Sequence, residues 1–113
     1  MSPAHDSGQG RRIDFARVNE SAARSGEAVV RALFPHGRLE GREWVFISPH
    51  RPDRSLGSCK INVDTGKGGD FSTGVYFGDF VGAAAWASGK GQRDAAIALA
   101  DSLGADPFEG GRA

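Results

Sequence analysis

The sequence predicts an α+β domain, in which a small antiparallel β-sheet is flanked by one N-terminal helix and two C-terminal helices. Apolar residues recur at helical spacing over residues 14–34 and again over residues 92–103. Between these segments, Cys59, Ile61 and Val63 alternate with polar residues, which is the period of a half-buried strand. The chain has 113 residues and a hydrophobic content of 39%, which suits one core but not two domains.

The first helix is expected over residues 14–34. Gly26 interrupts it weakly, Asn19 is a candidate cap for its later part, and Pro35 ends the pattern. The apolar positions of this segment are Phe15, Val18, Ala22, Val29, Val30 and Leu33.

The sheet is expected in the middle of the chain. Residues 42–48 (REWVFIS) are rich in β-branched and aromatic side chains, and two prolines follow, so they predict a strand that ends there. Residues 58–64 predict a second strand. The glycine-rich residues 64–69 predict a turn, and a short strand near residues 70–72 would close a hairpin. We therefore expect a sheet of three or four strands.

Two helices are expected after the sheet. Asp79 is a typical N-cap for the alanine-rich segment that follows it, and Gly89 ends that helix. The last helix covers residues 92–103, where small and apolar side chains recur at three-to-four spacing, and it ends at Gly104.

The two ends of the chain differ in composition from the middle. They are small, polar and glycine-containing, which predicts flexible tails at residues 1–12 and 106–113 and a single domain over residues 13–105. No stretch approaches the ~18 apolar residues of a membrane span, and no signal-peptide pattern occurs. The lone cysteine, Cys59, excludes an intramolecular disulfide and a multi-cysteine metal site. We expect a cytoplasmic protein with no membrane partner.

Charge supplies only a local argument for nucleic-acid binding. The 14 Lys and Arg residues balance the 14 Asp and Glu residues, whereas positions 38 to 67 hold six cations and four anions. The candidate nucleic-acid-binding residues are Arg38, Arg42, Arg51, Arg54, Lys60, Asn62 and Lys67. They would follow a phosphate backbone while Trp44, Phe71 or Tyr76 stacks a base. The alternative is a solvated strand face whose aromatic residues lie in the core.

No arrangement of residues indicates catalysis. The histidines at positions 5, 36 and 50 have no Ser, Asp or Cys neighbour in a recognisable nucleophile pattern. The TGKGG run at residues 65–69 lacks the upstream glycine, the following Ser or Thr and the helix of a phosphate-binding loop, which favours a hairpin turn. We expect a protein that is not an enzyme and has no cofactor.

Several short motifs follow one another between residues 33 and 107. They are LFPHGR at 33–38, SPHRPD at 48–53, GSCKIN at 57–62, GDFSTG at 69–74 and LADSLG at 99–104. In this order and spacing the chain resembles the zinc-ribbon domain at the N-terminus of bacterial and phage DNA primases. Within that family it is most similar to a zinc-less branch found in phage- and plasmid-type primase-helicases.

The resemblance also identifies the positions of a degenerate zinc site. Metal-binding members carry one ligand pair after the first strand and another after the central hairpin. The resemblance places Ser48 and Arg51 at the first pair, and Asp70 and Thr73 at the second. None of these residues is a Cys or His, so we expect no zinc and no other metal.

Two features are candidates to replace the stabilisation that zinc would supply. One hypothesis is a charge-assisted hydrogen bond between Arg51 and Asp70 that joins the two loops; the alternative is that both are solvated loop residues. The second feature is a larger aromatic core, for which the sequence offers Trp44, Phe46, Phe71, Phe80 and Trp86.

The resemblance implies a function without catalysis. In the primase family this module helps a separate catalytic domain to recognise its template, and that catalytic domain is missing here. The implied function is a template-recognition module of a phage or mobile element that contacts single-stranded DNA and works with a replication protein or a separate primase or helicase. The alternative is a protein-interaction module, such as a phage-type adaptor or inhibitor, that binds a host replication or defence protein without touching nucleic acid. The neutral net charge favours this alternative.

Overall fold

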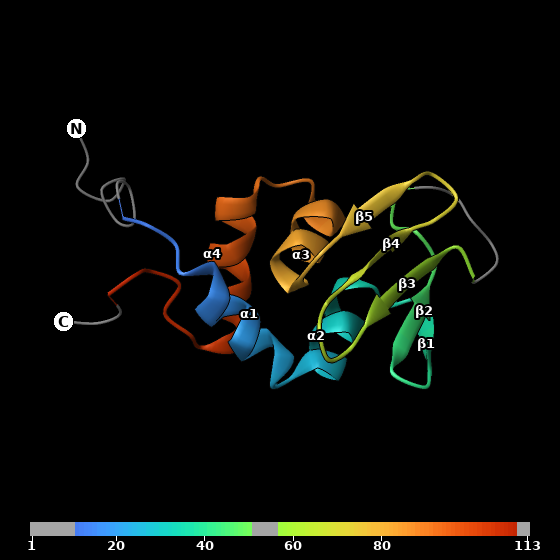
Figure 1. Cartoon of the computed structure of the whole chain (residues 1–113), viewed down its shortest axis with the longest axis horizontal. Helices are drawn as coiled ribbons and strands as arrows, with labels where there is room; N and C mark the ends of the chain where they lie inside the picture. The colour runs from blue at the N-terminus through green and yellow to red at the C-terminus, as the bar shows by residue number, and fades with distance from the viewer. Residues whose placement is uncertain (1–10, 51–56, 111–113) are drawn as a thin grey trace.

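The computed structural model describes residues 11–50 and 57–110, and in these residues five strands and four helices form an α+β fold (Figure 1). The strands pair in chain order as one antiparallel sheet: β1 Gly37–Glu40, β2 Glu43–Phe46, β3 Cys59–Asn62, β4 Gly68–Asp70 and β5 Val75–Phe77. The helices are α1 Phe15–Ala23, α2 Gly26–Leu33, α3 Phe80–Ser88 and α4 Gln92–Leu103. The predicted fold class is confirmed.

The sheet is wider than the expected three or four strands. Both edge strands, β1 and β5, were missed, because neither shows a long alternation of apolar and polar residues in the sequence. β1 pairs with β2 through a tight turn at Gly41, which has a φ of 63°. The central strand β3, which does alternate, was predicted correctly.

The expected single N-terminal helix is wrong, because the segment forms two helices. α1 ends at Ala23 and α2 begins at Gly26. A Cβ atom at position 26 would lie 1.7 Å from the carbonyl oxygen of Val63, so only glycine lets α2 begin this close to the end of β3.

Asn19 does not cap the later part of the N-terminal helical segment, as the sequence had suggested, but joins two helices. It lies inside α1, where its Oδ1 accepts a hydrogen bond from the N–H of Val81 at 3.0 Å. Its Nδ2 donates to the carboxylate of Asp79 at 3.1 Å. Through these bonds α1 holds the first turn of α3.

The limits of the two C-terminal helices agree with the sequence prediction. Asp79 caps α3 by accepting a hydrogen bond from the N–H of Gly82 at 2.8 Å. Gly89 and Gly104 end α3 and α4 in the left-handed conformation, with φ values of 75° and 70°. Within the described parts of the chain, no helix combines the length and apolar character needed to cross a membrane.

The core lies between the helices and one face of the sheet, and it is rich in aromatic rings. The rings of Phe34 and Phe46 stack at a centroid distance of 3.9 Å, and Phe77 and Trp86 pack beside them. We call these four residues the aromatic cluster. Of the residues expected in the core, Trp44, Phe46 and Phe80 are buried and Trp86 packs against it, whereas Phe71 is 46% exposed.

Residues 106–109 of the expected C-terminal tail contact residues 12–17 at the start of the domain. Ile13 and Phe108 form an antiparallel bridge, and the N–H of Asp14 donates to the carbonyl of Pro107 at 2.8 Å. The guanidinium of Arg17 donates to the carbonyl oxygens of Asp106 and Phe108. The domain therefore extends to these residues, beyond the predicted boundary at position 105.

Candidate nucleic-acid interface

The sheet has one face toward the helices and a second face, which we call the outer face. Trp44, Phe46, Cys59, Ile61 and Phe77 point to the helices and belong to the core. Side chains alternate along a strand, so their neighbours point the opposite way. The strand register places these neighbours in one row across the outer face: Arg38, Val45, Lys60, Gly69 and Tyr76.

Two aromatic side chains lie exposed on the outer face. Tyr76 is 70% exposed, and Phe71, which directly follows β4, is 46% exposed. Their ring centroids are 5.5 Å apart, with the planes inclined at 55°. We call these two residues the outer aromatic pair. Gly69 separates Tyr76 from Lys60 in the cross-strand row, so no side chain from β4 stands between the ring and the lysine.

The outer aromatic pair also lines a shallow depression of about 340 Å³. Lys67 and Glu43 contribute the charged groups of this depression, and Gly68, Phe77 and Gly78 complete its lining. Within the described residues neither Lys60 nor Lys67 forms an ion pair. Among the described cations of the predicted site, these two lysines are therefore the ones available to a phosphate.

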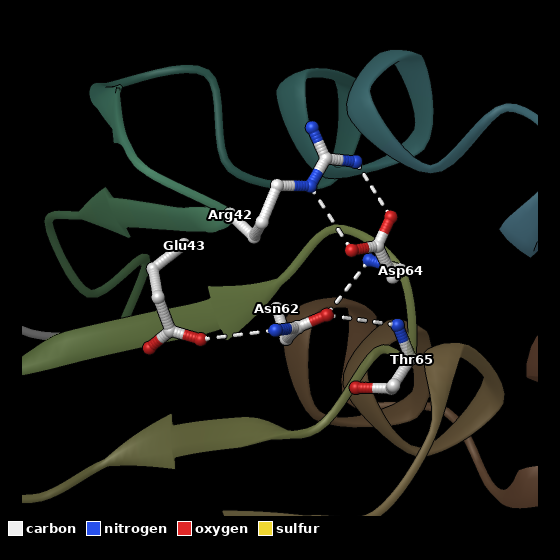
Figure 2. A network of polar contacts seen from close by, with 5 residues as sticks. All are labelled: Arg42, Glu43, Asn62, Asp64 and Thr65. Carbon is white, nitrogen blue, oxygen red and sulfur yellow. Dashed lines mark hydrogen bonds and ion pairs between the residues drawn. The ribbon is translucent and has the colours of Figure 1, made fainter.

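Arg42, another predicted site residue, is engaged in an ion pair. Its guanidinium donates two hydrogen bonds to the carboxylate of Asp64, at 3.0 and 2.5 Å (Figure 2). These hydrogen bonds lower the pKa of Asp64, and the same contact raises the pKa of Arg42. Arg38 is paired as well, because its Nε donates to Glu40 at 2.8 Å.

Asn62, also predicted to contact nucleic acid, has its side-chain amide engaged in the turn after β3. Its Oδ1 accepts hydrogen bonds from the backbone N–H groups of Asp64 and Thr65, at 2.8 and 3.0 Å (Figure 2). Its Nδ2 donates to Glu43 at 3.4 Å. This is the usual role of an asparagine that begins a turn. The last two predicted site residues, Arg51 and Arg54, lie outside the described residues.

Trp44 is not available to stack a base, which corrects one of the three expectations for aromatic contacts. It is 2% exposed, and its indole N–H donates to the carbonyl of Phe34 at 2.8 Å. The guanidinium of Arg31 lies over its ring, at 4.5 Å from the centroid. The reason is its register, because Trp44 points to the same side of β2 as Phe46.

Three of the four degenerate zinc positions, Ser48, Asp70 and Thr73, lie in the described residues, at one end of the sheet. Phe46, Cys59 and Asp70 share a cross-strand row, and Ser48 and Thr73 follow shortly after Phe46 and Asp70. Within the described parts of the chain, no three His, Cys, Asp or Glu residues gather as a metal site would require.

These three described positions take part in local hydrogen bonds. The buried Ser48 accepts from the N–H of His50 at 3.1 Å. Asp70 is 1% exposed, and its carboxylate accepts from the N–H and the hydroxyl of Ser72. Thr73 donates to the backbone carbonyl of Asp70. The hypothesis of a bond between Arg51 and Asp70 stays a prediction, because Arg51 lies outside the described residues.

His50 connects the first of these loops to α3. Its Nε2 donates to the carbonyl oxygen of Trp86 at 2.5 Å, and its ring meets the Trp86 ring edge-on at a centroid distance of 5.0 Å. The loop after β2 is thus attached to the aromatic cluster through the imidazole of His50. This contact and the stacked rings hold the loop after β2 against α3.

No family model, curated protein or solved structure matches the chain. The resemblance to primase zinc ribbons therefore depends on the order of the short motifs alone. The outer aromatic pair was foreseen only as two separate residues. The sequence signal for the exposure of Tyr76 is the VYF run at 75–77, in which Tyr76 points to the face opposite to that of its two apolar neighbours.

Proposed function

We propose that this chain is a non-catalytic module that binds single-stranded DNA on the outer face of its sheet. The observation that carries the proposal is the outer aromatic pair, two neighbouring exposed rings on a sheet surface with Lys60 and Lys67 nearby. Exposed rings on a sheet are a common platform for unpaired bases, since every base offers a flat π-face.

The energetics suit a weak, sequence-tolerant contact. Stacking of one base on an aromatic side chain contributes roughly 1–3 kcal/mol, and this term does not depend on salt. Two lysines that each neutralise one phosphate would make log affinity fall against log salt with a slope of about −1.4. Among the described arginines of the predicted site, Arg38 and Arg42 would add to this slope only by leaving Glu40 and Asp64.

The role that fits such a contact is template recognition, as the primase resemblance implies. The chemistry of primer synthesis would belong to a separate primase or helicase subunit. This part of the proposal has its support in the sequence, which offers no nucleophile arrangement.

Fluorescence anisotropy with a labelled single strand of about 20 nucleotides tests the proposal, at low and at moderate salt. We expect binding by the wild type that weakens about tenfold in Tyr76→Ala and several-fold in Lys60→Ala. Phe15→Ala is the matched control, because Phe15 is 40% exposed but lies on α1. The proposal fails if the strand does not bind at low salt, or if Phe15→Ala and Tyr76→Ala bind it equally well.

A further inference from the structure

β5 is a short edge strand that has neither a charged residue nor a proline to protect it. The sheet order ends at β5, so one side of this strand has no partner among the described strands. The opposite edge, β1, carries the charged residues Arg38 and Glu40. β5 consists of Val75, Tyr76 and Phe77 alone, with no charge, no proline and a glycine on either side. Exposed edges of this kind are templates for an added strand.

The hydrogen-bond pattern shows which backbone groups of β5 face outward. The N–H of Phe71 donates to Ser58, and the carbonyl of Lys67 accepts from Asn62, both at 2.8 Å. Residues 67, 69 and 71 therefore bond toward β3, so Gly68 and Asp70 bond toward β5.

Val75 and Phe77 are the register partners of Asp70 and Gly68, so their backbone groups are used within the sheet. The N–H and the C=O of Tyr76 consequently point away from β4. Within the described parts of the chain, no loop or side chain supplies a hydrogen bond to either group. Tyr76 thus offers one donor and one acceptor to an incoming strand.

A groove of about 530 Å³ runs beside this edge. Residues 75–79 form one wall, and Gly82, Ala85 and Trp86 of α3 form the other. Gly82 and Ala85 present no long side chain to this groove. A groove between an edge strand and a helix is a recurrent geometry for peptide recognition by strand addition.

The charged groups of the groove indicate the chemistry of its occupant. Asp79 is already engaged, since its carboxylate accepts from Gly82 and from Asn19. Lys90, at the turn between α3 and α4, also lines the groove and forms no ion pair within the described residues. The remaining charge of the groove is therefore positive, which favours an acidic residue in the ligand.

We propose that β5 binds an extended segment of a partner protein as a sixth strand. The backbone of Tyr76 exchanges two hydrogen bonds with the segment, its small or apolar residues face Gly82 and Ala85, and an acidic residue meets Lys90. This inference is independent of DNA binding, because it uses the backbone of Tyr76 and not the ring. The two sites can therefore be tested separately on one protein.

Two substitutions of Tyr76 distinguish peptide binding at β5 from DNA binding on the outer face. Tyr76→Pro removes the outward N–H, and it breaks no bond of the sheet because that N–H faces away from β4. Tyr76→Ala removes the ring but keeps the N–H. A peptide that adds to β5 should distinguish these variants, whereas DNA should lose affinity for both.

The experiment starts from a displayed library of random peptides of about ten residues, selected on the full chain. An enriched peptide is synthesised with a fluorophore and titrated by anisotropy. We expect enriched peptides to contain an acidic residue and to bind wild type and Tyr76→Ala within about twofold of each other, but Tyr76→Pro at least about tenfold more weakly. Lys90→Gln should bind several-fold more weakly.

Amide hydrogen exchange provides a readout that does not depend on the folding of the proline variant. In the free protein the Tyr76 amide should exchange faster than those of Val75 and Phe77, and the peptide should slow the Tyr76 amide selectively. The proposal is overturned if no peptide is enriched, if Tyr76→Pro binds like the wild type, or if the Tyr76 amide is not protected. If the wild type binds the peptide but does not bind single-stranded DNA, only the function proposed above is overturned.

Discussion

Tyr76 stands directly opposite Gly69 in the register of β4 and β5, and its ring packs on Phe71 instead of on a cross-strand neighbour. The pairing of β4 with β5 also requires glycine at position 69. A Cβ atom at position 69 would lie 2.0 Å from the carbonyl oxygen of Val75, far inside van der Waals contact. The sheet edge that bears the outer aromatic pair therefore depends on a residue with no side chain.

This contact predicts that Gly69→Ala destabilises the protein by roughly 1–3 kcal/mol, because the strands must separate to admit a methyl group. Urea denaturation measures the change in the free energy of unfolding. Gly78→Ala is the control, since a Cβ there meets no atom within 4 Å. Equal stability of the two variants would contradict the close approach of β4 and β5.

The bridge between α1 and α3 predicts that Asn19→Ala lowers the free energy of unfolding by roughly 1–3 kcal/mol. The substitution removes the partner of the Val81 N–H and the donor to Asp79, and both bonds are partly buried. The neighbouring Glu20→Ala, on the exposed side of α1, should change stability by less than about 0.5 kcal/mol. Thermal unfolding followed by circular dichroism tests the difference, which is absent if Asn19 is merely a surface residue.

The pair of Arg42 and Asp64 predicts a pH effect in the acid range. The hydrogen bonds from Arg42 lower the pKa of Asp64 below its ordinary value of 3.8, so the folded state binds this proton less readily than the unfolded state. The stabilisation is present above pH 3.8 and is lost as the pH falls through the lowered pKa.

A carbon-detected NMR titration of the Asp64 carboxyl group measures this shift. In Arg42→Gln the pKa of Asp64 should return toward its ordinary value, while Arg38→Gln, which breaks a different pair, should leave it unchanged. An identical titration curve in wild type and Arg42→Gln would refute the pairing.

The attachment of His50 to α3 predicts that His50→Ala destabilises the fold by about 1 kcal/mol and alters the fluorescence of Trp86. The variant loses the hydrogen bond to the Trp86 carbonyl and the edge-on ring contact. His36→Ala replaces another exposed histidine as the control. Adding a zinc chelator to the wild type should have no such effect, because Nε2 of His50 is bonded to the carbonyl of Trp86.

Local sequence patterns correctly predicted those helix ends that depend on residues close to them in the chain. The start of α3 at Asp79 and the ends of α3 and α4 at glycines follow from capping, which needs only neighbours in the chain. The two N-terminal helices show where this reasoning stops. The break at Gly26 results from the approach of Val63, a residue far away in the sequence.

Periodicity and capping were sufficient to predict the α+β class, the central strand β3 and the C-terminal helices. The use of the site residues, in contrast, follows from how distant segments pack together. Strand register places Trp44 in the core and directs Tyr76 outward. It also brings Arg42 next to Asp64. Among the described residues, Lys60 and Lys67 have no ion pair. These outcomes depend on pairing between distant segments, where a shift of one residue would reverse every face of the sheet.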